Sequence, residues 1–304
     1  MSTDTDSEQF GLVGDADISR EHLKNRIFHR LTFVAAIIGL VALAFLIADT
    51  LWEAARAVTE FDTSITHFLT ATGSTVPERA GFYAAIVGSL WLMALTAVLA
   101  LFVGVGAAIY LEEYAPDNRA TRLIEANLAN LAAVPSVVYG LVVLGLLVND
   151  PVNLGRTILA GSVALALVVM PIIIVSAIEA LRAVPDSVRA GSRAAGATQW
   201  QTIKNVVLPA AIPGIMTGTI LAMAQAIGQT APLLVVGALI GGRHVPGGPL
   251  DSLAAMTVTI FEWAFLFDEH FHVLAALGIV ILLGIMLSMN LLAIYIRNKY
   301  ETEV

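Results

Sequence analysis

Six long runs without Asp, Glu, Lys or Arg dominate the hydrophobic pattern of this chain. A helix needs about 20 consecutive apolar residues to cross the hydrocarbon core of a bilayer. Because lipid offers no partner to a backbone amide, such runs are expected to be helical. The pattern therefore predicts an all-α membrane protein with six transmembrane helices. The runs are Leu31–Ala48, Ala80–Leu111, Ala126–Asn149, Thr157–Ile178, a section of Asn205–Gly242, and Val273–Ile296.

The polar segments between these runs indicate an orientation. If the amino terminus is cytoplasmic, the segments on that side hold 12 of the 16 Lys and Arg residues. Cytoplasmic segments of membrane proteins are enriched in these residues. We therefore expect both termini on the cytoplasmic side. Residues 1–30 form a polar cytoplasmic tail whose acidic part we expect to be disordered, and residues 31–79 hold the first transmembrane helix and an outer segment.

Composition narrows the class of protein further. The chain of 304 residues is 58% hydrophobic and 13% charged, with a mean hydropathy of +0.82, whereas soluble domains carry about 25% charge. It has no Gly-Lys dipeptide, so a phosphate-binding loop of an ATPase is excluded. We expect no enzyme activity of its own, no cofactor, no metal site and no nucleic-acid partner.

The runs also lack the carboxylates that ion-coupled carriers place inside the membrane. This favours a passive path whose gating comes from another component. The polar side chains that could line such a path are hydroxyls and amides. The candidates are Ser136, Tyr139, Gln225, Gln229 and Thr230. The alternative for Gln225 and Gln229 is simple packing, and for Ser136 and Tyr139 it is a hydrogen bond to a neighbouring helix.

A short basic loop separates the fourth and fifth runs. Pro185 is followed by Asp186 and Ser187, either of which is a plausible N-cap of a helix. Arg189 and Arg193 lie four residues apart and would share one face of that helix. Small residues recur up to Ala197, which would let the helix lie close to another surface. Docking to a cytoplasmic partner and packing within the same subunit both fit this pattern.

This loop resembles the EAA loop of the membrane subunits of ABC importers. The family pattern is Glu-Ala-Ala, three residues, Gly, nine residues and Ile-x-Leu-Pro. Gly196 and the closing Val206–Pro209 stand at that spacing, while Ala190-Gly191-Ser192 replaces the opening triplet. The resemblance implies a coupling loop (179–209) whose helix sits in a cleft of a partner ATPase. Its expected residues are Asp186, Arg189, Ala190, Gly191, Ser192, Arg193, Gly196, Ala197, Leu208 and Pro209.

Four further segments resemble PstA-type phosphate permeases: 107–118, 125–146, 226–234 and 291–301. The resemblance covers residues 80–301, which we expect to form the permease domain. It implies the type I ABC importer (MetI-like) fold in the plasma membrane, and translocation of inorganic phosphate. The partners it implies are a PstC-like permease in a heterodimer, two PstB-like ATPase subunits that hydrolyse ATP, and a PstS-like phosphate-binding protein.

The fifth run departs from the family. Gln225 and Gln229 stand where the family typically has Arg and Glu four residues apart. We hypothesise that the two amides contact each other or the path, replacing an ion pair together. Without the arginine, either the partner permease supplies the positive charge or the anion is another oxyanion, such as sulfate, molybdate or tungstate. A different class of transport protein, a channel or carrier that works without an ATPase, is the further alternative.

Overall fold

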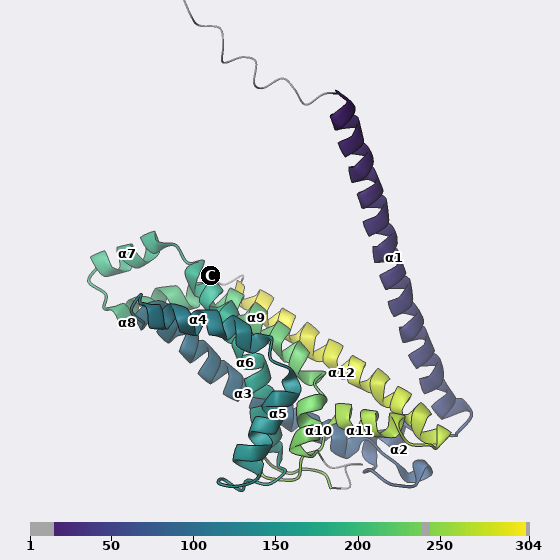
Figure 1. Ribbon diagram of the computed structural model, residues 1–304. Helices are drawn as coiled ribbons and strands as arrows, with labels where there is room; N and C mark the ends of the chain where they lie inside the picture. The colour runs from purple at the N-terminus through teal and green to yellow at the C-terminus, as the bar shows by residue number, and fades with distance from the viewer. Residues whose placement is uncertain (1–14, 239–243, 302–304) are drawn as a thin grey trace, which may run out of the picture. The chain divides into compact units, whose positions relative to one another are not determined.

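The computed structural model describes residues 15–238 and 244–301, and every regular element in these ranges is helical apart from one isolated bridge between Thr157 and Ser252 (Figure 1). The long α-helices are α1 (Asp15–Thr59), α3 (Tyr83–Ile109), α6 (Ile158–Arg182), α9 (Leu208–Ile227) and α12 (Glu269–Glu301). The shorter ones are α2 (Ile65–Thr70), α4 (Arg119–Ala132), α5 (Ser136–Val143), α7 (Asp186–Ala194), α8 (Gln199–Thr202), α10 (Ala231–Val236) and α11 (Met256–Ala264).

The chain divides into two units, with the boundary between Trp52 and Glu53. The first unit holds most of α1, which begins at Asp15, so residues 15–30 of the predicted polar tail are helical and continuous with the first span. The expectation of disorder is wrong for Asp15 and Asp17, and the rest of the acidic stretch lies outside the described residues.

Among the described residues, five helices are long and apolar enough to cross a membrane, and a bent pair brings the number to six if it forms one span. The bent pair corrects the predicted third run, Ala126–Asn149, which is not a straight helix. α4 ends at Ala132, and α5 with its π-helical extension leaves at 102° to it. Pro135 explains the break, because the residue before a proline is disfavoured in the helical conformation.

α6 lies at the centre of the second unit, and two-thirds of its most apolar stretch is buried (67%). It packs against both α3 and α9, which also contact each other. Ala160, Ala164, Ile173 and Ala177 are fully buried along its length. The three alanines let the neighbouring backbones approach, which is how helices associate in lipid, where burial of apolar surface gives little driving force.

The contact between α6 and α9 is the closest of these approaches. Gly214 and Gly218, four residues apart on α9, face Ala180 and Ser176, four apart on α6. A β-carbon added at Gly218 would lie 2.3 Å from the Ser176 Cβ, and one at Gly214 would lie 2.7 Å from the Ala180 Cβ. Small residues at this spacing on both helices fix the distance between them.

The opposite end of the unit from α7 and α8 is closed by α2 and α11 (Figure 1). Trp263 of α11 stacks among Phe68, Phe82 and Phe271 and is only 1% exposed. Its ring is part of the protein core, because α11 packs against α12 and α3.

We predict that Gly218→Ala separates α6 from α9, because the new methyl group has no room beside Ser176. Overpacking of this kind costs about 1–3 kcal/mol. The thermal unfolding midpoint of the detergent-solubilised protein should fall. Gly106→Ala on α3 is the control, because nothing lies within 4 Å of the added atom, and it should leave the midpoint unchanged or raise it. Equal midpoints for the two variants would contradict the close approach.

Candidate coupling loop and substrate path

The predicted coupling loop (179–209) connects α6 to α9, which pack against each other. α6 ends at Arg182, α7 runs from Asp186 to Ala194, and α8 begins at Gln199 and continues through a π-helical turn into α9. Within the second unit, α7, α8, α4 and the carboxyl-terminal end of α12 lie at the same end (Figure 1). The loop is therefore held between α6 and α9 and projects from one end of the helical unit.

The two ends of α7 are formed in different ways. Pro185 occupies the N-cap position without a side-chain bond, so the prediction that Asp186 or Ser187 caps the helix is wrong: Asp186 is the first helical residue. Its carboxylate still favours the helix start, where the backbone dipole is positive. At the other end, the Gly196 and Ala197 amides donate to the Arg193 and Ser192 carbonyls. Gly196 has a φ of +88°, a conformation that glycine adopts without strain.

Arg189 attaches α7 to the rest of the subunit. Its guanidinium pairs with the Glu113 carboxylate at the end of α3 and donates to the Leu181 carbonyl at 2.6 Å. The Arg189 and Glu113 side chains are 12% and 11% exposed. Nearby, the Ser192 and Thr202 hydroxyls lie 3.0 Å apart, which joins α7 to α8. Arg189 and Ser192 thus anchor the helix and are not available to a partner.

The remaining side of α7 is exposed. Ala190, Gly191, Arg193 and Ala194 are open to the surroundings, and no residue of α7 is fully buried. Trp200 on α8 is also exposed, at 57%. The two interpretations of the sequence therefore each describe one side of the helix: one side packs within the subunit, and the other is free to meet a second protein.

A second ion-pair cluster supports the same end of the unit. Arg182 bonds to Glu112 at 2.7 Å and to Glu125 at 3.0 Å, so it joins the end of α6 to the segment that follows α3 and to the middle of α4. Sequence reasoning missed Glu112, Glu113, Glu125 and Arg182. The two adjacent carboxylates after the second apolar run were the available signal, but only the fold brings them opposite arginines that are about 70 residues away in sequence.

The predicted path residues lie around two breaks in the helices. Ser136 begins α5, next to the α4–α5 bend, and Thr230 lies in the break between α9 and α10. α5 and α10 pack closely, since a β-carbon at Gly140 would lie 2.8 Å from the Pro232 Cα and O atoms. The two breaks are thereby brought side by side. Irregular backbone at membrane depth is tolerated where it is buried in protein or lines a cavity.

Tyr139 has a structural partner: its hydroxyl donates to the Leu131 carbonyl at 2.8 Å, across the α4–α5 bend. The alternative interpretation, a bond to a neighbouring helix, therefore describes Tyr139. Gln225 and Gln229 do not share a helix, because α9 ends at Ile227. No hydrogen bond joins their side chains among the described residues, and Gln225 is exposed. The Gln229 carbonyl instead accepts from the Thr257 hydroxyl at 3.4 Å.

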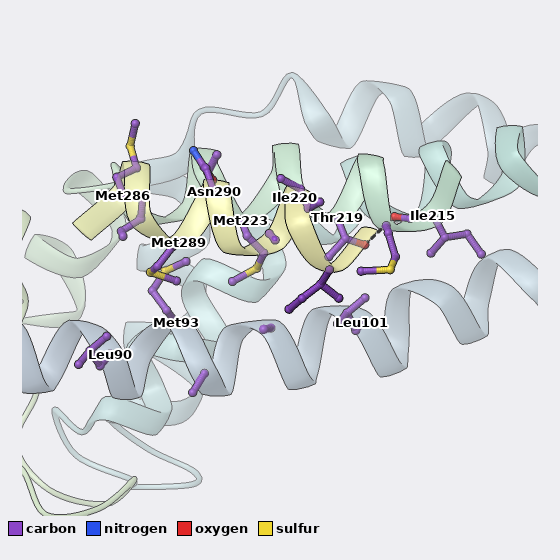
Figure 2. Close-up of a pocket in the computed structure, with 17 residues that line it drawn as sticks. Leu90, Met93, Leu101, Ile215, Thr219, Ile220, Met223, Met286, Met289 and Asn290 are labelled. Carbon is purple, nitrogen blue, oxygen red and sulfur yellow. Dashed lines mark hydrogen bonds between the residues drawn. The ribbon is translucent and has the colours of Figure 1, made fainter. Parts of the chain in front are cut away.

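A groove of about 600 Å³ runs between α3, α9 and α12 (Figure 2). Five methionines line it, together with aliphatic side chains and only two polar residues, Thr219 and Asn290. None of the predicted path residues lies in it. A surface of hydrocarbon and thioether groups offers an anion few donors, so this groove is not suited to phosphate. The lining methionines are Met93, Met216, Met223, Met286 and Met289.

The arrangement of apolar helices around a projecting coupling loop defines a multi-pass membrane permease. The chain belongs to the family of binding-protein-dependent transport system inner membrane components, whose model matches residues 100–301. It is a family of transport subunits. The membership confirms the fold class inferred from the EAA-like loop and the apolar runs.

Similar proteins agree with this assignment. A probable ABC transporter permease protein, YqgI of Bacillus subtilis, is 33% identical over 58% of this chain and 60% of its own length. The phosphate transport system permease protein PstA of Mycobacterium leprae is 36% identical over 71% of this chain and 70% of its own length. The inward-facing MetNI methionine ABC transporter has the same fold: the TM-score is 0.57 at 16% identity, covering 72% of this chain and 97% of that one.

We predict that Arg189→Ala loosens α7, because it leaves the mostly buried Glu113 carboxylate without its partner. Breaking a buried ion pair costs about 3–5 kcal/mol. Hydrogen exchange of the amides in residues 186–202 should accelerate. Arg193→Ala is the matched control, since Arg193 is exposed and makes only a 3.4 Å bond to the Arg189 carbonyl.

A double variant tests whether the pair is the cause. Glu113→Gln combined with Arg189→Ala should be no more destabilised than Arg189→Ala alone, because the interaction is already lost. Fully additive effects, or the same exchange rates in Arg189→Ala and Arg193→Ala, would show that the pair does not hold the helix.

Proposed function

We propose that this protein is the membrane-spanning permease subunit of an ATP-driven importer for inorganic phosphate. The observation that carries the proposal is the projecting loop between α6 and α9, exposed on one side and anchored through Arg189 on the other. The PstA relative, of which 70% is covered, supports phosphate as the substrate. Residues 80–301 act as the permease domain, in the plasma membrane, with both termini cytoplasmic.

The proposed partners are a PstC-like permease, two PstB-like ATPase subunits and a PstS-like binding protein. In this proposal the exposed side of α7 sits in a cleft of one ATPase subunit. Closure of the ATPase dimer on ATP moves α7, and the Arg189–Glu113 and Arg182–Glu112 pairs pass the displacement to α3 and α6. Because α8 continues into α9, the helix that carries Gln225 moves as well.

The test is to purify the chain together with these partners in lipid vesicles. We expect ATP hydrolysis to rise when both phosphate and the binding protein are present, and not with sulfate, molybdate or tungstate. Stimulation by one of those anions instead of phosphate would favour the alternative importer. If the chain transports phosphate without associating with any ATPase, it is a channel or carrier.

For the path, we propose Ser136, Gln225, Gln229 and Thr230 as polar contacts around the paired helix breaks. Gln225 is exposed on α9 and its side chain has no hydrogen-bond partner among the described residues, so its side-chain amide is available to an anion or to the second permease. An amide donates two hydrogens without the cost of an unpaired charge in the membrane.

We predict that Gln225→Ala lowers the initial rate of phosphate uptake about fivefold, the effect of losing one hydrogen bond of about 1 kcal/mol. The thermal unfolding midpoint should not change, because the side chain is exposed. Val98→Ala on α3 is the control, as Val98 is similarly accessible at 52% and apolar. Unchanged uptake in Gln225→Ala would remove this residue from the path.

A further inference from the structure

We propose that the methionine-lined groove between α3, α9 and α12 is a binding site for one anionic phospholipid. Its acyl chain lies along the groove, and its phosphate is bound by Arg297 at the end of α12. The inference does not depend on which solute the protein transports.

The groove has the size and chemistry of an acyl-chain site. Its volume of about 600 Å³ lies within the usual range of small-molecule sites. Figure 2 shows Met93, Met223 and Met289 from three different helices pointing toward a common space. Methionine side chains are flexible and polarizable, so they adapt to an irregular apolar ligand. The groove also follows the length of the helices, as an extended chain requires.

Arg297 places a positive charge at one end of the groove. It follows Ile296, a lining residue, and donates to the Thr217 hydroxyl at 3.4 Å, next to the lining residue Met216. Its other contacts are two bonds to the Asn298 side-chain oxygen, at 3.0 and 3.2 Å. Arg297 has no carboxylate partner within the described ranges. These contacts use three of the five guanidinium N–H groups, which leaves two for a phosphate.

The positive charge of Arg297 indicates which kind of lipid binds. Any lipid tail can fill an apolar groove on a transmembrane unit, so the preference between lipids depends on the headgroup. A guanidinium with only neutral partners at one end of the groove favours an anionic headgroup over a zwitterionic one. Lys299, exposed two residues further along, adds to the positive potential. Basic sites between transmembrane helices bind anionic headgroups for this reason.

The site also has a structural consequence. α3 and α12 each contact α9, and residues of all three helices line the groove. A lipid held there would fill the gap between the helices and pack against Met216, Thr219 and Met223 of α9. Since α9 continues from the coupling loop, the lipid would limit how far α9 can move toward α3.

The test titrates the purified full-length chain in detergent with dioleoylphosphatidylglycerol or dioleoylphosphatidylcholine, which have identical tails, and counts bound lipid by native mass spectrometry. We expect phosphatidylglycerol to bind more tightly. Arg297→Gln should weaken phosphatidylglycerol about fivefold, the effect of one basic residue near a lipid surface, and leave phosphatidylcholine unchanged. Arg119→Gln removes an exposed charge from α4, outside the groove, and is the control.

A second variant tests the tail site. Ala97→Phe places a ring in the groove from α3 and should reduce binding of both lipids alike. The proposal is overturned if the two lipids bind equally, if Arg119→Gln acts like Arg297→Gln, or if Ala97→Phe leaves binding unchanged. Cross-linking of Ala97→Cys to a second permease in the assembled importer would also overturn it, because the groove would then be a protein interface.

Discussion

The close contact between α6 and α9 is the constraint on which the second unit depends. Gly214 and Gly218 meet Ala180 and Ser176 at distances that admit no further side-chain atom. In lipid, helices gain little from burying apolar surface, so close van der Waals packing must hold them together. α3 also packs against α6, and the coupling loop joins the α6 and α9 ends. The spacing of these helices therefore sets where the loop begins and ends.

Charged contacts then fix the loop itself. The Arg189–Glu113 and Arg182–Glu112–Glu125 interactions join the ends of α3 and α6 to α7 and to the middle of α4. They connect α7 to α3 and α6 to α4, so a displacement of α7 reaches several helices at once. The anchored and exposed sides of α7 have different composition: arginine and serine on the first, alanine and glycine mainly on the second.

Two sides of α9 face different surroundings. One side of the helix contributes Met216, Ile220 and Met223 to the apolar groove. Gln225 is exposed on another side, near the break that brings α10 against α5. A single helix thus borders both a lipid-like surface and a polar one. Its movement with the coupling loop would affect both.

The class of protein follows from the sequence alone, since long apolar runs without charged residues are typical of membrane helices, and the EAA-like spacing places Gly196 where α7 ends. The sequence could not determine which residues meet. The bend before α5, the separation of Gln225 from Gln229 and the burial of Trp263 depend on helix packing. Arg189 illustrates the reason: local spacing put it on a helix face, but only the approach of Glu113, 76 residues earlier, decided that this face points inward.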